Sequence, residues 1–124
     1  VITGDGEMLM GLGSLSTVGL QQPKNLAVVV LDNEHFGETG MQTTHTAASV
    51  NLAEIARASG ISSSWTVRES SEISTTREKL LHEEGPLFCG IKVRAETLPL
   101  VLPPKEGEIL QKRFRNALMN ENGD

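Results

Sequence analysis

Two stretches decide the fold of this chain, Gly4-Asp5-Gly6-Glu7 and Leu26-Ala27-Val28-Val29-Val30-Leu31-Asp32-Asn33-Glu34-His35. The first follows Val1–Thr3, a short β-branched segment typical of a strand end, and its two glycines indicate a sharp backbone turn. The second begins with an unbroken apolar run, which is typical of a strand buried on both faces. Each predicted strand therefore ends in a turn that carries a polar side chain, Asp5 in one turn and Asn33 in the other.

The two turns are expected to lie at the same edge of one sheet. A helical pattern separates the two predicted strands, and a right-handed crossover through that helix places them parallel. Open α/β sheets bind their ligands at the carboxyl edge of their parallel strands. The sequence therefore predicts that Asp5 and Asn33 meet in space.

The remaining elements are predicted from apolar spacing and from stop signals. Helices are expected from residue 7 to a stop at residues 22–24, then over 50–59, about 70–83 and 106–119. Further strands are expected over 64–68 and 86–93, residues 32–46 form the longest irregular loop, and 97–104 form an extended connector. The pattern predicts an α/β fold, a doubly wound and mostly parallel sheet with helices on both faces.

The start of the chain suggests that the domain is incomplete. The sequence opens at Val1, already inside a predicted strand, and four strands are fewer than such a sheet normally has. We expect residues 1–119 to form one domain that lacks its N-terminal part, followed by a polar tail over 120–124. Exposed apolar surface would then require a partner chain or domain.

Composition narrows the classes of function. Eleven basic and sixteen acidic residues give a net charge of -5, and no basic cluster offers a surface to nucleic acid. The longest apolar run, residues 26–31, is far shorter than the roughly 20 residues that a membrane span needs. The lone cysteine, Cys89, lies in an apolar setting, favours core packing over nucleophilic chemistry, and fits a cytoplasmic location.

The polar groups in the two turns match the chemistry of a metal-bound phosphate. Oxygen ligands suit Mg²⁺, which is commonly held by one or two protein groups together with phosphate oxygens. A glycine-rich turn that leads into a helix adds backbone N–H groups for the same phosphates. Gly4-Asp5-Gly6 by itself is equally compatible with a structural turn, but its pairing with Asn33 favours a Mg²⁺-diphosphate site.

These residues resemble a known family. Gly4-Asp5-Gly6, then residues 7–32, then Asn33 is similar to the thiamine diphosphate fingerprint of 2-oxo acid decarboxylases and their relatives. Residues 4–15 and 31–42 resemble the sulfopyruvate and phosphonopyruvate decarboxylase branch in particular. The resemblance implies the diphosphate-binding half of the thiamine diphosphate fold, as a C-terminal domain or a beta subunit. Asp32 departs from the commonest pattern, in which a second asparagine precedes Asn33.

The resemblance also implies a set of site residues. The side chains of Asp5 and Asn33, with the main-chain carbonyl of His35, would bind Mg²⁺. Backbone N–H groups of Gly6 and Glu7 would donate to the diphosphate of the cofactor, and Gly37 would leave room for it. The residues predicted to contact the cofactor are Gly4, Asp5, Gly6, Glu7, Met8, Asn33, His35, Phe36 and Gly37. Glu38 and Thr39 are catalytic candidates that would contact the substrate, although a solvated loop is an equally simple interpretation.

The same resemblance implies a partner. The glutamate that activates the cofactor in this family belongs to a pyrimidine-binding domain or alpha subunit, so the chain is expected to be active only in a homo- or hetero-oligomer. The expected reaction is decarboxylation of a short anionic 2-oxo acid. Two alternatives remain open at this point, a carboligase of the acetolactate synthase type and a non-catalytic phosphate-binding α/β module.

Overall fold

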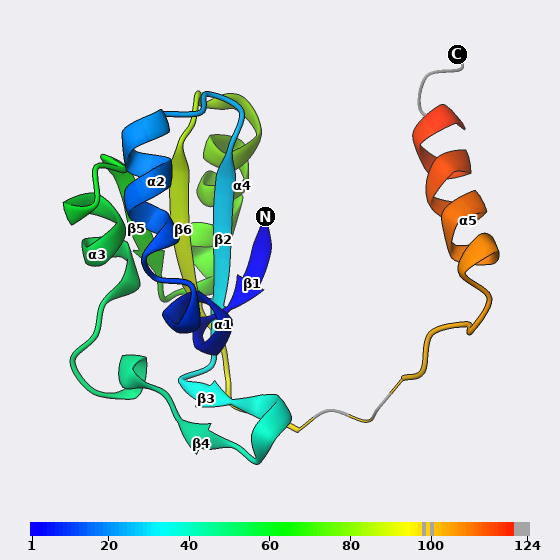
Figure 1. Cartoon of the computed structure of the whole chain (residues 1–124), viewed down its shortest axis with the longest axis horizontal. Coiled ribbons are helices and arrows are strands. Elements are labelled where there is room, and N and C mark those ends of the chain that lie inside the picture. Colours follow the sequence, from blue (N-terminus) through cyan, green and yellow to red (C-terminus); the bar gives the residue numbers. More distant parts are fainter. Residues whose placement is uncertain (98, 100, 121–124) are drawn as a thin grey trace.

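The computed structural model describes residues 1–97, 99 and 101–120 and contains a central sheet of four parallel strands (Figure 1). The strands are β1 (Ile2–Gly4), β2 (Ala27–Asp32), β5 (Ser63–Val67) and β6 (Leu87–Lys92), in the order β1-β2-β6-β5. Each adjacent pair is parallel. The predicted parallel α/β architecture is therefore confirmed, and β1 and β2 are neighbours whose carboxyl ends lie side by side.

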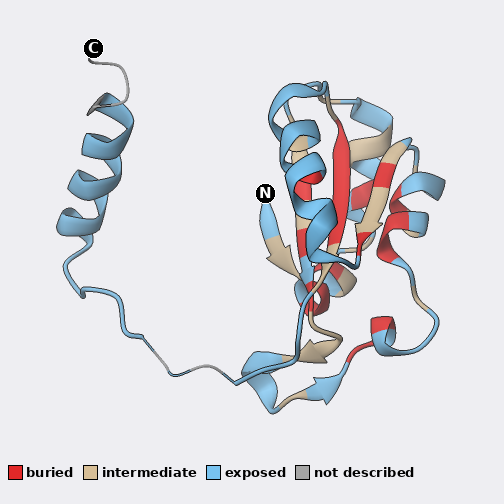
Figure 2. Cartoon of the chain, turned by 180° about the vertical axis from the view of Figure 1, so that it is seen from behind, coloured by how far each residue is buried: buried red, intermediate tan, exposed pale blue. Residues whose placement is uncertain are grey.

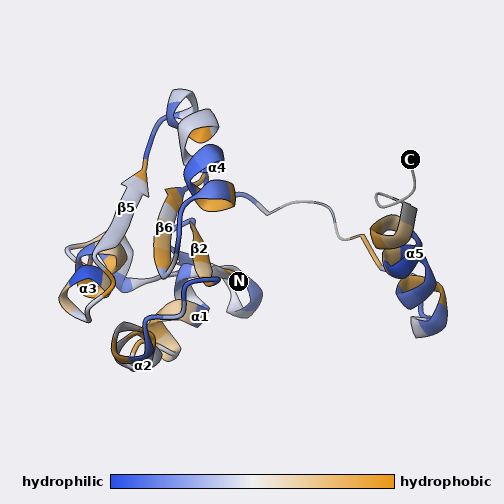
Figure 3. Cartoon of the chain, turned by 90° about the horizontal axis from the view of Figure 1, so that it is seen from above, coloured by the Kyte–Doolittle hydropathy of each residue, from blue (hydrophilic) through white to orange (hydrophobic). Residues whose placement is uncertain are grey.

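Helices cover both faces of this sheet. Seen from above, α2 (Ser14–Gln21) and α3 (Leu52–Ala58) lie on one face and α4 (Ile73–His82) lies on the other (Figure 3). The main core is formed between the sheet and the first pair of helices, by Met8, Leu15, Val28, Val30, Leu52, Ala53, Ala56, Ile61 and Phe88. On the opposite face Trp65 packs on α4, where its Nε1 donates to Thr76 Oγ1 at 3.3 Å.

The expectation that β2 is buried on both faces is wrong. Val28 and Val30 are buried, whereas Leu31 is 43% exposed and the edge residue Ile2 is 75% exposed. The buried apolar residues of β2, Val28 and Val30, belong to the core that α2 and α3 cover, whereas β6 has four consecutive buried residues (buried residues are red in Figure 2). On the opposite face α4 contacts β5 through Thr76 and Trp65, and its residues Leu80 and Leu81 lie near Ala27 at the start of β2. An apolar run alone does not reveal whether both faces are covered.

The single helix predicted after the first turn is divided in two. Helix α1 (Asp5–Met10) begins two residues earlier than expected, and a turn over residues 11–13 separates it from α2. Gly11 closes α1, with its N–H on the carbonyl of Glu7 at 3.0 Å, and Ser14 N then donates to Gly11 O at 2.9 Å. Glycine lowers helix stability by about 1 kcal/mol relative to alanine, so two glycines in this turn end the helix.

The loop after β2 also contains structure that the sequence did not predict. Strands β3 (His35–Phe36) and β4 (Gln42–Thr43) form an antiparallel pair, with short 3-10 turns η1 (Gly37–Thr39) between them and η2 (His45–Ala47) after them. Strands of two residues carry no alternating pattern. The result is a small hairpin that projects from the carboxyl edge of the sheet (Figure 1).

The sequence offers Asn51 or Ser49 as the N-cap of α3, and Ser70 or Ser71 as the N-cap of α4. Asn51 caps α3 as predicted, because its Oδ1 accepts from Ala53 N at 3.0 Å and Glu54 N at 3.2 Å. Neither Ser70 nor Ser71 caps α4. A 3-10 turn, η3 (Ser70–Glu72), precedes that helix, and the Glu72 carboxylate accepts from the backbone N–H groups ahead of it.

The C-terminal helix α5 (Gly107–Asn120) stands apart from the sheet at the end of an extended segment (Figures 1 and 2). Its bounds agree with the predicted helix over 106–119. Residues 98 and 100 of the predicted connector, and 121–124 of the predicted tail, lie outside the described residues. Within the residues that are described, no helix is both long and apolar enough to cross a membrane.

Candidate cofactor site

A cavity of about 490 Å³ lies at the carboxyl ends of β1 and β2 and is bordered by the β3–β4 hairpin. The cavity brings together ten of the eleven residues predicted to bind cofactor or act in catalysis: Gly4, Asp5, Gly6, Glu7, Asn33, His35, Phe36, Gly37, Glu38 and Thr39. Met8 is the exception, since its side chain is buried in the hydrophobic core. The predicted convergence of the two turns is thus present, while the role of each residue stays a prediction.

The charge of the cavity wall is mainly negative. The acidic residues Asp5, Glu7 and Glu38 line it. Arg94 is the only basic residue, counting lysine and arginine, among the lining residues, and its Nε is paired with Glu96 Oε1 at 2.9 Å. A diphosphate entering alone would meet net repulsion. A phosphate ligand therefore fits this cavity only together with a cation.

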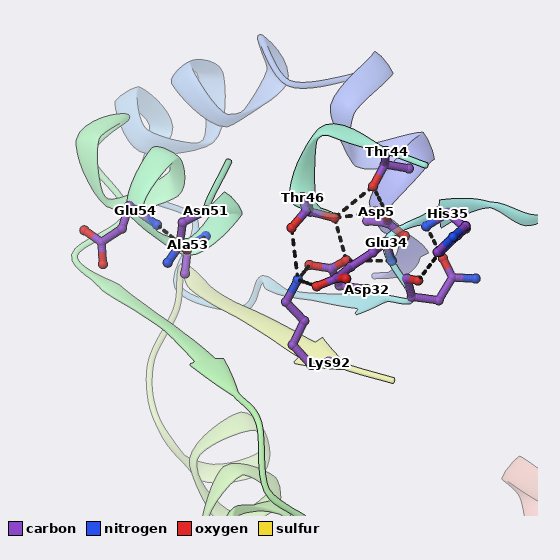
Figure 4. A network of polar contacts seen from close by, with 11 residues as sticks. Asp5, Asp32, Glu34, His35, Thr44, Thr46, Asn51, Ala53, Glu54 and Lys92 are labelled. Atoms are coloured by element: carbon purple, nitrogen blue, oxygen red, sulfur yellow. Dashed lines mark hydrogen bonds and ion pairs between the residues drawn. The ribbon is translucent and has the colours of Figure 1, made fainter. Parts of the chain in front are cut away.

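Asp5 is the buried carboxylate of the site. It is 1% exposed, and its Oδ2 accepts a hydrogen bond from Thr44 Oγ1 at 2.6 Å and lies 3.3 Å from Thr46 Oγ1 (Figure 4). Among the described residues Asp5 takes part in no ion pair. A buried carboxylate without a counter-ion is costly, which keeps Asp5 a candidate for binding a cation.

The two carboxylate oxygens of Asp5 differ in their hydrogen bonds. Within the described part of the chain Oδ1 receives no hydrogen bond, although every fully buried side-chain oxygen there has a partner. Oδ1 is therefore not fully enclosed, and Asp5 is one of the residues that line the cavity. The carboxylate is held through one oxygen and free to bind a ligand through the other.

Asn33 is held in a tight turn with His35. Its Oδ1 accepts the backbone N–H of His35 at 2.9 Å, and His35 Nδ1 lies 2.9 Å from the carbonyl oxygen of Asn33. Because a carbonyl only accepts, Nδ1 of His35 must be the protonated ring nitrogen. An amide oxygen has two lone pairs, so Asn33 Oδ1 retains one for a metal ion.

The first turn of α1 is capped by the side chain of Glu7. The carboxylate of Glu7 turns back to accept from Thr3 Oγ1 at 2.7 Å and from the backbone N–H of Gly4 at 3.2 Å, and these hydrogen bonds lower the pKa of Glu7. The N–H groups of Gly6 and Glu7, in the first turn, have no carbonyl partner within the helix. Those two groups are available for the phosphate oxygens that the sequence predicts.

The contact with Phe36 leaves no room for a side chain at Gly6. A Cβ at this position would lie 2.5 Å from Cδ1 of Phe36, so the ring of Phe36 occupies the space of a side chain. The hairpin therefore closes directly on the first turn of α1. Gly37, by comparison, faces open space, where an added Cβ would meet only Asn33 Nδ2 at 4.0 Å.

A second cluster of charged residues adjoins the site and was missed by the sequence analysis. Lys92 Nζ lies 2.8 Å from Asp32 Oδ2 and 2.6 Å from Glu34 Oε1, and Asp32 Oδ1 accepts from Thr46 Oγ1 at 2.7 Å (Figure 4). Burial alone would lower the pKa of Lys92, but the hydrogen bonds and charges of Asp32 and Glu34 outweigh burial and raise it. Lys92 is therefore positively charged at neutral pH. No local sequence pattern marks this cluster, because the match of Asp32 with Lys92 follows from the pairing of β2 with β6.

Two other histidines and the lone cysteine lie outside this arrangement. His45 is exposed, and His82 Nε2 pairs with Glu78 on the surface of α4. Cys89 is fully buried, and burial, with a smaller contribution from the charge of Glu72, raises the pKa of its thiol to about 11. A thiol that stays protonated is a poor nucleophile, which confirms the interpretation of Cys89 as core packing.

The sequence was compared with known proteins. Residues 1–91 match the family described as thiamine pyrophosphate enzyme, C-terminal TPP binding domain. The chain therefore belongs to this family of thiamine pyrophosphate enzymes and corresponds to their C-terminal cofactor-binding domain, as the resemblance implied.

Individual relatives narrow the comparison further. The chain is 38% identical to sulfopyruvate decarboxylase subunit beta of Methanocaldococcus jannaschii over 125 residues, which is 95% of this chain and 62% of that protein. It is 36% identical to phosphonopyruvate decarboxylase of Streptomyces viridochromogenes, over 93% of this chain and 29% of that protein. The chain thus spans less than two thirds of the length of these relatives.

Proposed function

We propose that this chain is the diphosphate- and Mg²⁺-binding part of a thiamine diphosphate-dependent decarboxylase that acts on a short anionic 2-oxo acid. The observation that carries the proposal is the meeting of Asp5, Asn33 and His35 in one cavity beside the first turn of α1. The similarity to sulfopyruvate and phosphonopyruvate decarboxylases supports this substrate class.

The donor set suits Mg²⁺ better than a softer metal. Asp5 offers one open carboxylate oxygen, Asn33 an amide oxygen with a spare lone pair, and His35 a main-chain carbonyl, and Mg²⁺ prefers such oxygen ligands. Among the described residues no group of three or more His, Cys, Asp or Glu side chains is placed to hold a metal. We infer that the metal completes its coordination with phosphate oxygens of the cofactor.

The remaining residues would orient the bound cofactor. Backbone N–H groups of Gly6 and Glu7 would donate to the diphosphate, and the open space beside Gly37 would admit it. When bound, thiamine diphosphate supplies the electron sink that allows a 2-oxo acid to lose CO₂. Glu38 and Thr39, on the hairpin side of the cavity, remain candidates for contact with the substrate.

The proposal includes a partner. The relative from Methanocaldococcus jannaschii is named as a subunit beta, and this chain covers 62% of its length. Ile2 and Leu31 are exposed on the face of β1 and β2 opposite the main core, so apolar surface is available there for another domain or chain. We propose that a pyrimidine-binding domain or alpha subunit completes the site in an oligomer, and that the chain alone is inactive.

Binding of the cofactor is the first test. Thiamine diphosphate is titrated by calorimetry with Mg²⁺ and with EDTA, using the protein together with its pyrimidine-binding partner. We expect binding that depends on Mg²⁺, and weaker binding to this chain alone because part of the pocket is then missing. Equal affinity with and without metal would favour a phosphate-binding module without thiamine chemistry.

Product analysis is the second test. With sulfopyruvate or phosphonopyruvate, a decarboxylase releases CO₂ and the corresponding aldehyde, after a proton replaces the lost carboxylate. Pyruvate, which lacks the second anionic group, is expected to react poorly. A product with a new carbon–carbon bond would instead assign the protein to the acetolactate synthase type.

A further inference from the structure

Thr44 and Thr46 connect Asp5 to the Asp32–Lys92 pair. Thr44 Oγ1 lies 2.6 Å from Asp5 Oδ2, Thr46 Oγ1 lies 2.7 Å from Asp32 Oδ1, and the two hydroxyl oxygens are 2.8 Å apart (Figure 4). Both threonines are buried, at 4% and 5% exposure. They lie just after β4, so the end of the hairpin is attached to the ends of β1 and β2 through side chains.

Counting protons assigns a different task to each hydroxyl. A hydroxyl carries one proton, and a carboxylate can only accept. The proton of Thr44 therefore serves Asp5, its carboxylate neighbour. The shortest carboxylate contact of Thr46 is to Asp32, at 2.7 Å compared with 3.3 Å to Asp5. Thr44 is thus the principal donor to the predicted metal ligand, and Thr46 anchors the same segment to Asp32.

The position of this donor determines which oxygen of Asp5 faces the cavity. Thr44 holds Oδ2, while Oδ1 accepts no hydrogen bond from the described residues and retains access to the cavity. Without the Thr44 hydroxyl, rotation about the Cβ–Cγ bond would no longer be opposed by a short charge-assisted hydrogen bond. The carboxylate would then present its open oxygen less often in the orientation that a metal requires.

We propose that Thr44 is a positioning residue, which orients Asp5 for Mg²⁺ through its hydroxyl, and that the Thr46–Asp32–Lys92 chain holds Thr44 in place. The inference rests on the proposed function, because it concerns the same metal site. Partners of this kind behind a metal ligand typically change metal affinity about 10- to 100-fold when they are removed.

The test uses two substitutions that differ in the hydroxyl. Thr44→Val keeps the shape of the side chain and removes the hydroxyl, whereas Thr44→Ser keeps the hydroxyl. The Mg²⁺ concentration that half-saturates thiamine diphosphate binding is measured by calorimetry in the assembly with the pyrimidine-binding partner. We expect Thr44→Val to need about 10- to 100-fold more Mg²⁺ and Thr44→Ser to stay close to wild type.

Thr76→Val is the matched control. Thr76 is also buried, at 5% exposure, and its hydroxyl also has one side-chain partner, Trp65 Nε1, but it lies on α4, away from the cavity. This variant is expected to lower the melting temperature without changing the Mg²⁺ requirement. If Thr44 had only a structural role, Thr44→Val would behave in the same way.

An unchanged Mg²⁺ requirement in Thr44→Val would overturn the proposal, as would an equal increase in Thr76→Val. Should Thr44→Val fail to fold, Thr44→Ala removes the same hydroxyl with less bulk and is judged by the same measurement. Failure of the proposed function is distinguishable, because the wild-type protein itself would then show no Mg²⁺-dependent binding of thiamine diphosphate.

Discussion

Asp5 and Asp32 occupy equivalent places in the sheet but differ in their surroundings. Each is a buried acid at the carboxyl end of a strand, Asp5 directly after β1 and Asp32 as the last residue of β2. Each accepts a hydrogen bond from a buried threonine of the same short segment. Asp32 also has a cation, Lys92 at 2.8 Å, whereas Asp5 has none among the described residues.

The difference shows how the fold keeps one charge for a ligand. Lys92 is the partner of Asp32 in the register of β2 and β6, so the counter-ion of Asp32 is supplied by the sheet itself. A buried carboxylate without such a partner is destabilising unless something else supplies the positive charge. Because Lys92 pairs with Asp32, Asp5 is the acid of the two that has no counter-ion among the described residues. The same ion pair explains how Asp32 is tolerated where the commonest fingerprint has asparagine.

The largest effect is expected from Asp5→Asn. This change removes the only charged ligand predicted for Mg²⁺, so Mg²⁺-dependent binding of thiamine diphosphate should be lost in calorimetric titrations. The metal-free protein should be no less stable in urea unfolding, because the substitution removes a buried charge that has no counter-ion. Retention of wild-type Mg²⁺ dependence would contradict the placement of the metal at Asp5.

Lys92→Met is expected to act on stability. Removal of the cation leaves Asp32 and Glu34 without a counter-ion beside Asp5, and breaking a buried pair from one side costs about 3 kcal/mol. The free energy of unfolding of the metal-free protein, measured in urea, should fall by about that amount. Lys24→Met is the matched control, since Lys24 pairs with Glu84 on an exposed surface and should have little effect.

A smaller effect is expected from Asp32→Asn. Lys92 then keeps Glu34 as a partner and Thr46 keeps an amide acceptor, so the loss should be about 1 kcal/mol in urea unfolding. The double variant with Lys92→Met should be more stable than Lys92→Met alone, because the uncompensated acid is gone. Additive effects would show that the two side chains do not interact and would remove the contrast between Asp5 and Asp32.

Much of the frame of the site could be predicted from the sequence. Gly4-Asp5-Gly6 and the run that ends at Asn33 lie on adjacent parallel strands, so a rule about strand ends was enough to bring the two residues to one cavity. The cap by Asn51 depends on residues that are close in sequence, since its Oδ1 accepts from Ala53 N. These predictions succeeded because each depends on a few neighbouring residues or on the general geometry of parallel sheets.

The parts that were missed depend on contacts between distant segments. Lys92 lies far along the chain from Asp32, and their pairing follows from a strand order that the residues alone do not give. The burial of Thr44 against Asp5 depends on a hairpin of two-residue strands, which leaves no periodic signal. The open side of β2 at Leu31 depends on which elements cover the sheet, and an apolar run carries no such information.

The smallest effect is expected from Lys92→Arg, and it appears only in alkaline solution. The pKa of Lys92 is raised above the ordinary lysine value of 10.5, so the folded state holds this proton more tightly than the unfolded state. The stability that Lys92 contributes is therefore full below pH 10.5 and is lost as the pH rises through the raised value. Arginine stays charged throughout this range. The difference between the unfolding free energies of wild type and Lys92→Arg should thus be constant below pH 10.5 and change only above that pH, in favour of arginine.

Titration of Cys89, whose pKa is about 11, is common to both proteins and cancels in their difference. A change in the difference near neutral pH would mean that Lys92 loses its proton there, and it could not then be the permanent counter-ion that distinguishes Asp32 from Asp5.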